Sequence, residues 1–190
     1  METKSIQQIS DIIADCPNCS LAKTRINAVP GQGNPQAKIM FVGEAPGKNE
    51  DLKGIPFVGA AGKYLDKLLA LANLSRDTIF ITNIVKCRPP ENRDPLPTEI
   101  DECSVYLSSQ IKLMQPKLIV TLGRHSLHYW IPEGVISKIH GSITSVNNLN
   151  IFPMYHPVAA LYRGNLREII EEDYVKLGKY IKNFEFGENQ

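Results

Sequence analysis

Residues 38–51 read KIMFVGEAPGKNED and contain the clearest structural signal in the chain. The apolar run at 38–42 predicts a buried strand. A loop follows that is rich in glycine and carries the carboxylates Glu44, Glu50 and Asp51. In an α/β sheet, ligands bind in loops at the carboxyl ends of strands. We therefore expect a functional site here, although the same composition also fits a solvated turn, in which Asp51 only caps the residues after it.

Strand and helix patterns alternate along the rest of the chain. The predicted strands are residues 38–42, 78–82, 118–123 and 151–155, and the predicted helices are residues 5–14, 63–72, 98–114, 124–130 and 165–181. A hairpin is expected within residues 142–152, whereas the prolines of residues 86–95 exclude helix and central strand. This alternation indicates an α/β fold with a parallel sheet and helices on both of its faces.

Three polar side chains directly follow predicted strands, namely Glu44, Asn83 and His156. Parallel strands end at one edge of their sheet, so these residues are expected to share one cleft. Each also has a plainer interpretation, because asparagine is common at turns and a lone histidine is usually structural. We assign the other histidines, His125, His128 and His140, to structural roles.

Composition bounds the possible functions. The chain has 190 residues, of which 43% are hydrophobic, and this suits a single domain over residues 1–190. Its formal net charge of +1 excludes a basic field over the whole surface, so any binding to DNA requires a local patch. The amphipathic start lacks the apolar core of a signal peptide, and no apolar run would span a bilayer, so we expect a cytoplasmic protein.

The four cysteines are expected to be metal ligands, since disulfides are rare in the cytosol. Cys16 and Cys19 form a C-x-x-C pair, and Cys87 and Cys103 supply two further thiols. Four thiolates suit either tetrahedral zinc or a four-iron, four-sulfur cluster, and the spacing does not decide between them. Buried free thiols are the alternative, and that alternative is strongest for Cys103.

Four motifs in order resemble the family 4 uracil-DNA glycosylases, the iron–sulfur members of their superfamily. They are GEAPG (43–47), GIPFVGAAG (54–62), TNIVKCRPPENRDP (82–95) and YHPVAALYR (155–163). The resemblance implies a three-layer α/β/α fold with a central four-stranded parallel sheet. It also implies a monofunctional DNA repair enzyme that hydrolyses the N-glycosidic bond of deoxyuridine. A structural four-iron, four-sulfur cluster on Cys16, Cys19, Cys87 and Cys103 is implied as well.

The resemblance assigns roles at the predicted strand ends. Phe57 would stack on the flipped uracil, Asn83 would read its edge, and His156 would stabilise negative charge on O2. In better-known relatives an aspartate stands where this chain has Ala45, so Glu44, Glu50 or backbone carbonyls would position the attacking water. The implied uracil-binding set is Gly43, Glu44, Ala45, Phe57, Asn83 and His156, and the implied catalytic set is His156, Glu44 and Glu50.

DNA contacts are expected on both sides of this cleft. Leu161 or Tyr162 would enter the space that the flipped nucleotide leaves. The candidate phosphate-binding residues are Lys86, Arg88, Arg93, Arg163 and Arg167. The expected partner is uracil-containing DNA, single- or double-stranded. A sliding clamp is a candidate further partner, and we expect a monomer without membrane contact.

Two other functions remain open at the level of sequence. One is a non-catalytic DNA-binding module held together by zinc or a cluster. The other is a nucleotide-dependent oxidoreductase with a redox cluster, against which stands the lack of a G-x-G-x-x-G motif after the first predicted strand.

Overall fold

The computed structural model describes residues 5–183, which form an α/β fold around a six-stranded sheet of order β1-β3-β2-β4-β6-β5. The strands are β1 (Gln32–Gly33), β2 (Ile39–Gly43), β3 (Phe80–Asn83), β4 (Leu118–Leu122), β5 (Thr144–Val146) and β6 (Leu149–Met154). The four inner strands are parallel, as predicted, and β1 and β5 pair antiparallel with them at the two edges. The expected sheet of four strands is thus corrected to six. The two residues of β1 are too few to give an apolar pattern, whereas β5 and β6 form the hairpin expected within residues 142–152.

The longer helices lie close to their predicted positions. They are α1 (Ile6–Ala14), α3 (Ala60–Leu71), α4 (Pro97–Met114), α5 (Arg124–Trp130) and α8 (Arg167–Asn183). Short helices that sequence periodicity did not reveal are α2 (Lys48–Lys53), α6 (Ile136–Ile139) and α7 (Val158–Tyr162), with single 3₁₀ turns at η1 (Ser20–Lys23), η2 (Pro90–Asn92) and η3 (Gly164–Leu166). Between residues 5 and 183, no helix has both the length and the apolar character needed to cross a bilayer. The sequence after Lys182 is acidic and polar, and residues 184–190 of it lie outside the described residues.

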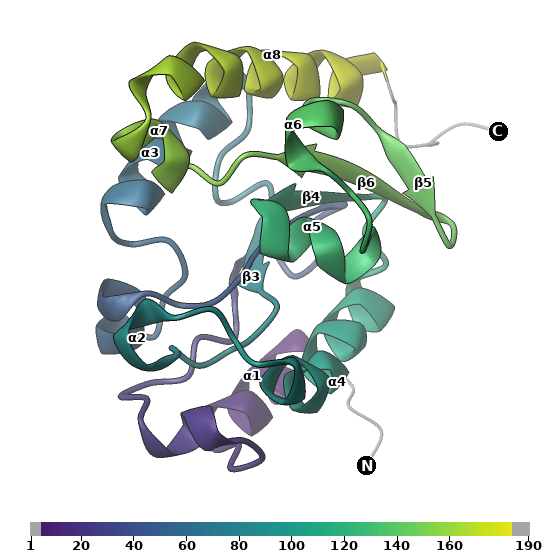
Figure 1. Cartoon of the computed structure of the whole chain (residues 1–190). Coiled ribbons are helices and arrows are strands. Elements are labelled where there is room, and N and C mark those ends of the chain that lie inside the picture. Colours follow the sequence, from purple (N-terminus) through teal and green to yellow (C-terminus); the bar gives the residue numbers. More distant parts are fainter. Residues whose placement is uncertain (1–4, 184–190) are drawn as a thin grey trace, which may run out of the picture.

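Successive side chains of β2 point to opposite faces of the sheet, and each face is covered by helices, which gives three layers. Ile39 and Phe41 point into a core formed with α3 and α8, and Met40 and Val42 point into a second core formed with α1 and α4. Figure 1 shows α3 and α8 on one side of the strands and α1 and α4 on the other. With both faces covered, the inner strands are apolar throughout, as is typical of parallel sheets.

Strand register brings the functional loops together. Gly43 at the end of β2 lies beside Asn83 at the end of β3, and Leu122 at the end of β4 lies beside Met154 in β6. The loops that follow these four parallel strands therefore leave the sheet at one edge. This is the edge at which ligands bind in open α/β sheets.

Candidate active site

A cavity of about 400 Å³ opens at this edge of the sheet. Its lining includes Glu44 after β2, Asn83 of β3, His125 after β4 and His156 after β6, together with Phe57 from the segment between α2 and α3. The three residues expected to form a pyrimidine slot, Phe57, Asn83 and His156, therefore lie around one space. Its volume is within the range of small-molecule sites.

Phe57 is held in an unusual backbone conformation. Its φ is +53°, a left-handed value that is strained for an aromatic residue. Glu50 stabilises the turn from one side, because its Oε1 accepts hydrogen bonds from the backbone N–H groups of Val58 (2.9 Å) and Gly59 (3.0 Å). Oε1 of Glu50 therefore shapes the loop that carries the aromatic ring, and the residue also lines the cavity.

Arg76 fixes the same turn from the other side. Its guanidinium donates to the carbonyl oxygens of Pro56 (3.1 Å) and Phe57 (2.6 Å), and it also pairs with Asp66 (2.6 Å). Gly62 allows α3 to pass close by, since a Cβ there would lie only 1.8 Å from the Phe57 carbonyl oxygen. The ring is thereby set in place before any ligand binds, 5.6 Å from the imidazole of His156 and tilted by 27° from it.

Asn83 is 2% exposed and lines the cavity. Within residues 5–183 its side-chain amide makes no hydrogen bond, and its atoms are not among the enclosed side-chain atoms that lack a partner, because the residue lines the cavity. Gly43 makes room for it, because a Cβ at that position would lie 2.3 Å from Asn83 Oδ1 and 2.9 Å from the Phe57 ring. An unsatisfied amide beside an aromatic ring suits the edge of a planar polar ligand.

His156 presents one defined hydrogen-bond donor. Its Nδ1 accepts from the backbone N–H of Val158 (3.1 Å), which places the ring proton on Nε2. Burial lowers the pKa of His156 to about 4, and the negative charge of Glu50 opposes this only in part. The side chain is thus a neutral imidazole near neutral pH, with an Nε2–H group available to a ligand.

Glu44 is half-buried at the cavity wall. Burial and, secondarily, the charge of Asp94 raise the pKa of Glu44 to about 7, and Arg124 opposes the shift. His125, which the sequence analysis assigned to a structural role, instead lines the cavity with its Nε2 atom 3.9 Å from Glu44 Oε2 and 3.2 Å from Asp94 Oδ2. Burial lowers the pKa of His125.

Glu44, Asp94 and His125 are the only three side chains among the described residues whose possible metal-binding atoms all lie within 4.8 Å of one another. The guanidinium of Arg124, 3.7 Å from Asp94, would repel a cation there. His125 and Arg124 could have been found from the sequence, because they follow β4 just as Glu44 follows β2.

The family model described as the uracil DNA glycosylase superfamily matches residues 30–176. The chain belongs to this superfamily. A type-4 uracil-DNA glycosylase of Sulfurisphaera tokodaii is 49% identical over 91% of this chain and 83% of its own length. Proteins of the same description from Archaeoglobus fulgidus (45% identical, 93% of each chain) and Thermotoga maritima (40% identical, 92% of this chain and 93% of its own) are similar. The resemblance drawn from the four motifs is confirmed.

The four cysteines line a second, small cavity between α1, η1, the loop after β3, and α4. None forms a disulfide, and two of the sulfurs accept hydrogen bonds, Cys87 from Arg25 Nη1 (3.1 Å) and Cys103 from the Lys86 backbone N–H (3.3 Å). Burial raises the pKa of both thiols, that of Cys103 to about 11. Because metal coordination removes the thiol proton, donors aimed at sulfur fit a thiolate-bound metal group.

Glu99 of α4 links η1, which follows Cys19, to the loop between Cys87 and α4. Its side chain is 2% exposed and accepts from Ser20 Oγ (2.6 Å), from the Leu96 backbone N–H (2.8 Å) and from both terminal nitrogens of Arg93 (2.7 and 2.9 Å). The hydrogen bonds from Arg93 are the main reason that the pKa of Glu99 falls to about 2. Arg93, expected to bind phosphate, is therefore already paired with a carboxylate, although it remains at the rim of the active-site cavity.

Two further sequence assignments are wrong. Lys86 was expected to contact phosphate, but it is 1% exposed, and its Nζ donates to Thr82 Oγ1 (2.7 Å), the Asn83 carbonyl (2.7 Å) and Gln110 Oε1 (2.9 Å). Asp51 does not cap the turn after it. It is buried, and its Oδ1 accepts from the backbone N–H groups of residues 26 and 27, far earlier in the chain.

The remaining candidate DNA contacts lie on the surface. Leu161 and Tyr162 end α7 and are 43% and 84% exposed, and Arg163 directly after them is exposed as well. Arg167 is exposed with its guanidinium 5.7 Å from the ring centre of Tyr64, whereas Arg88 is partly buried and donates to Asn92 Oδ1 (2.7 Å). The exposed side chains of Leu161 and Tyr162 thus lie close in sequence to the exposed arginines Arg163 and Arg167.

Proposed function

We propose that the protein is a monofunctional uracil-DNA glycosylase that acts in DNA repair. It hydrolyses the N-glycosidic bond of deoxyuridine in DNA, releases free uracil and leaves an abasic site. The observation that carries this proposal is the convergence of Phe57, Asn83 and His156 on one cavity at the edge of the sheet. The relatives named type-4 uracil-DNA glycosylase support the same reaction.

Access to the bond requires that the nucleotide leave the helix, which costs a few kcal/mol. The ring of Phe57 offers a stacking platform for the extruded base, an interaction worth about 1–3 kcal/mol for any base. Stacking therefore contributes to affinity and leaves selection among bases to the polar groups. We assign Glu50 to this step as a positioning residue, because its carboxylate oxygen is used by the Phe57 turn.

Selection of uracil follows from the amide of Asn83. A carboxamide can accept a hydrogen bond from N3–H of uracil while it donates to O4. Cytosine presents an acceptor at N3 and a donor at the 4-position, so both contacts would be mismatched. Because Asn83 has no other hydrogen-bond partner for its side chain among residues 5–183, binding of cytosine would leave the amide unpaired, and this disfavours cytosine.

Bond cleavage leaves negative charge on uracil and positive charge on the sugar. Nε2–H of His156 can donate to uracil O2, where the negative charge develops, and a neutral donor there needs no change of protonation during the reaction. The backbone N–H groups of the turn at Glu44 and Ala45 are candidates to assist. A water must then reach C1′ of the sugar, and Glu44 is the carboxylate at the cavity wall that can orient it. An already cationic sugar requires little activation of that water.

The pH dependence of the reaction tests this role of Glu44. Its pKa is raised to about 7, so the carboxylate becomes the main form only above that pH. We expect the single-turnover rate to rise between about pH 6 and pH 8, falling about tenfold per unit at lower pH. Glu44→Gln should flatten this profile and lower the rate at high pH by about tenfold or more.

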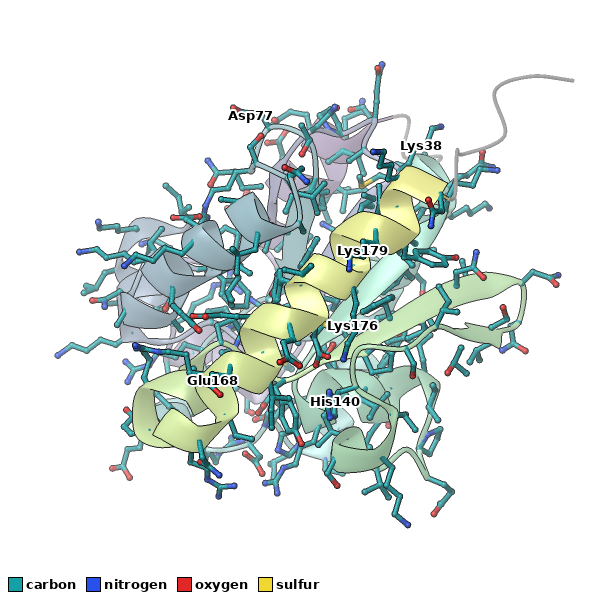
Figure 2. All side chains as sticks on the ribbon, turned by 90° about the horizontal axis from the view of Figure 1, so that it is seen from above. Lys38, Asp77, His140, Glu168, Lys176 and Lys179 are labelled. Carbon is teal, nitrogen blue, oxygen red and sulfur yellow. The ribbon has the colours of Figure 1, made fainter. Side chains whose placement is uncertain are left out.

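Glu168→Gln is a matched control for that experiment. Glu168 is an exposed carboxylate on α8, labelled in Figure 2. Its variant should retain the wild-type profile. A pH profile for Glu44→Gln with the same midpoint and slope as wild type would assign the water to another group.

We propose that Cys16, Cys19, Cys87 and Cys103 hold a four-iron, four-sulfur cluster. Tetrahedral zinc with Zn–S bonds of about 2.3 Å would bring its sulfurs to within about 4 Å of one another. Among the described residues, no three cysteine sulfurs lie within 4.8 Å, which suits a wider group. When bound, the cluster would act as a structural clamp between α1, the loop after β3, and α4.

Iron analysis and thermal unfolding test the cysteine site. Protein purified without air should contain about four iron atoms and matching sulfide per chain. Cys103→Ala should lose that iron, and a loss of about 3 kcal/mol would lower Tm by about 6–12 °C in a domain of this size. Zinc in place of iron would contradict the cluster, and an unchanged Tm would contradict its role as a clamp.

DNA binding is assigned to the surface beside the cavity. Leu161, with Tyr162 next to it, would enter the gap left by the flipped nucleotide. Arg88, Arg163 and Arg167, joined by Arg124 at the cavity rim, would contact phosphates, and Arg93 would hold the rim in shape through Glu99.

The decisive experiment is release of uracil. An oligonucleotide with one deoxyuridine is incubated with the metal-loaded protein, and free uracil and alkali-labile abasic sites are measured. Equal amounts of both are expected, with none from an oligonucleotide that carries cytosine at the same position. Binding of the oligonucleotide without any release would support the DNA-binding module instead.

A further inference from the structure

The buried lysine beneath the active site has no assigned role in the reaction. Lys86 is 1% exposed, and its ammonium donates to three oxygens, namely Thr82 Oγ1 (2.7 Å), the Asn83 carbonyl (2.7 Å) and Gln110 Oε1 (2.9 Å). No carboxylate pairs with it among the described residues. Because burying a lysine head group without a carboxylate partner is costly, an apolar side chain would fill this position at a lower cost if only packing mattered.

The oxygens around the ammonium form a closed network. Thr82 Oγ1 and Gln110 Nε2 both donate to the carbonyl oxygen of Pro30 at 2.8 Å, and this leaves Thr82 Oγ1 and Gln110 Oε1 free to accept from Lys86. These partners come from three separate segments: β3, α4 and the loop before β1. The position of the ammonium is therefore fixed by the fold on every side.

The main chain of Lys86 is equally well held. Its N–H donates to Cys103 Sγ (3.3 Å), and its carbonyl accepts from the N–H of Val29 (2.7 Å). The residue thus spans the distance between the cysteine site and the last residue of β3. Its backbone belongs to the cysteine site, and its side chain reaches back to the Asn83 carbonyl.

Asn83 needs such an anchor because its own side chain has none. The amide makes no hydrogen bond within residues 5–183, so its direction depends on the backbone of Asn83 and on the close contact with Gly43. The assigned strand ends at this residue, and the N–H of the peptide that follows it, from Ile84, donates to the Gly43 carbonyl (3.0 Å), so that the carbonyl of the same peptide is the group left for the ammonium. The ammonium binds the peptide at this point and limits its rotation.

We propose that Lys86 is a positioning residue for base recognition, which fixes the Asn83 peptide and thereby aims its side-chain amide at the base. This inference rests on the proposed function. It predicts that loss of the ammonium weakens the binding of the base itself more than the binding of the DNA backbone. A merely structural role would instead lower stability while leaving the affinity of the folded protein for uracil unchanged.

The test measures inhibition by free uracil in parallel with turnover. Lys86→Met keeps the length of the side chain and removes its donors. We expect the inhibition constant for free uracil to rise about tenfold. This is the change expected if the Asn83 amide loses about one hydrogen bond to the base. Preference for uracil over cytosine should fall, while the affinity for DNA with an abasic-site analogue and the iron content stay unchanged.

A second variant and a control make the result decisive. Thr82→Val removes one acceptor of the ammonium at nearly constant volume, and we expect a smaller rise of about two- to threefold in the same constant. Lys179→Met removes an exposed lysine of α8, seen in Figure 2, and should behave as wild type. Wild-type inhibition constants in both Thr82→Val and Lys86→Met would overturn the proposal, and Thr82→Val alone decides if Lys86→Met does not fold. Failure of the wild-type protein to excise or bind uracil would instead refute the proposed function.

Discussion

Replacing His156 by alanine is expected to lower kcat for uracil release by about 10²–10³. The reason is the donor that His156 aims into the cavity, since Val158 occupies Nδ1 and leaves Nε2–H to meet charge that develops on uracil O2. This contact strengthens as the bond breaks, so its loss should appear in kcat rather than in the affinity for DNA. Single-turnover rates and equilibrium binding, measured on the same oligonucleotide, separate the two quantities.

His128→Ala is the matched control. His128 is an exposed histidine on α5 whose Nε2 atom lies 3.0 Å from the Gly134 carbonyl, away from the cavity lining. Its loss should leave both quantities near their wild-type values. Equal losses of rate and binding in His156→Ala would make His156 a binding residue.

The protonation state of His156 gives an independent check. Burial lowers its pKa to about 4, so the imidazole stays neutral and keeps the same proton between about pH 5 and pH 8. Any change in rate across that window must then come from another group, and Glu44, with a pKa of about 7, is the candidate. In the Glu44→Gln variant the rate should therefore be nearly constant over the window. A remaining inflection near pH 6.5 would show that His156 titrates close to its ordinary value.

The parts of the fold that sequence predicted share one property, which is a long and repeated apolar pattern. The buried run before Gly43 and the periodic residues of α3 and α4 are of this kind. Once the order of strands and helices is known, the rule that parallel strands end at one edge places Glu44, Asn83 and His156 together. The edge strand β1 has two residues, too few for any pattern, whereas β5 belongs to the hairpin that was expected within residues 142–152.

The errors arose where a side chain is used by a distant segment. Lys86 stands in a polar, proline-rich stretch and looked exposed, but its three acceptors include Gln110, which lies on α4. Asp51 looked like a local cap, but it binds the backbone at residues 26 and 27. Arg76, which holds the Phe57 turn, gives no signal in the sequence, because it follows no strand and belongs to no motif. Only the packed structure reveals such pairings.

Replacing Asn83 by aspartate is expected to have the largest effect on specificity. A site built around a hydrogen-bonded edge can reject the wrong partner by about 10⁴–10⁵. The aspartate keeps the size of the side chain but replaces the amide donor, which is fixed on one atom, by a carboxyl proton that either oxygen can carry. In a buried position its carboxyl group favours the protonated form, which can donate to N3 of cytosine and accept from the 4-amino group. Release of cytosine should become measurable, and the ratio of the uracil rate to the cytosine rate should fall by about 10² or more.

Asn83→Ala separates this reversal from a general loss of binding, because it removes both hydrogen-bonding atoms and offers none to cytosine. It should slow release of uracil without any gain on cytosine. The comparison uses two oligonucleotides that differ only in the target base, each with all three proteins, and the readout is the ratio of the two single-turnover rates. If Asn83→Asp keeps the wild-type ratio, then the base is read elsewhere in the cavity. In that event the Asn83 amide beside Gly43 and Phe57 would not be the group that reads the base. The positioning role proposed for Lys86 would then be wrong as well.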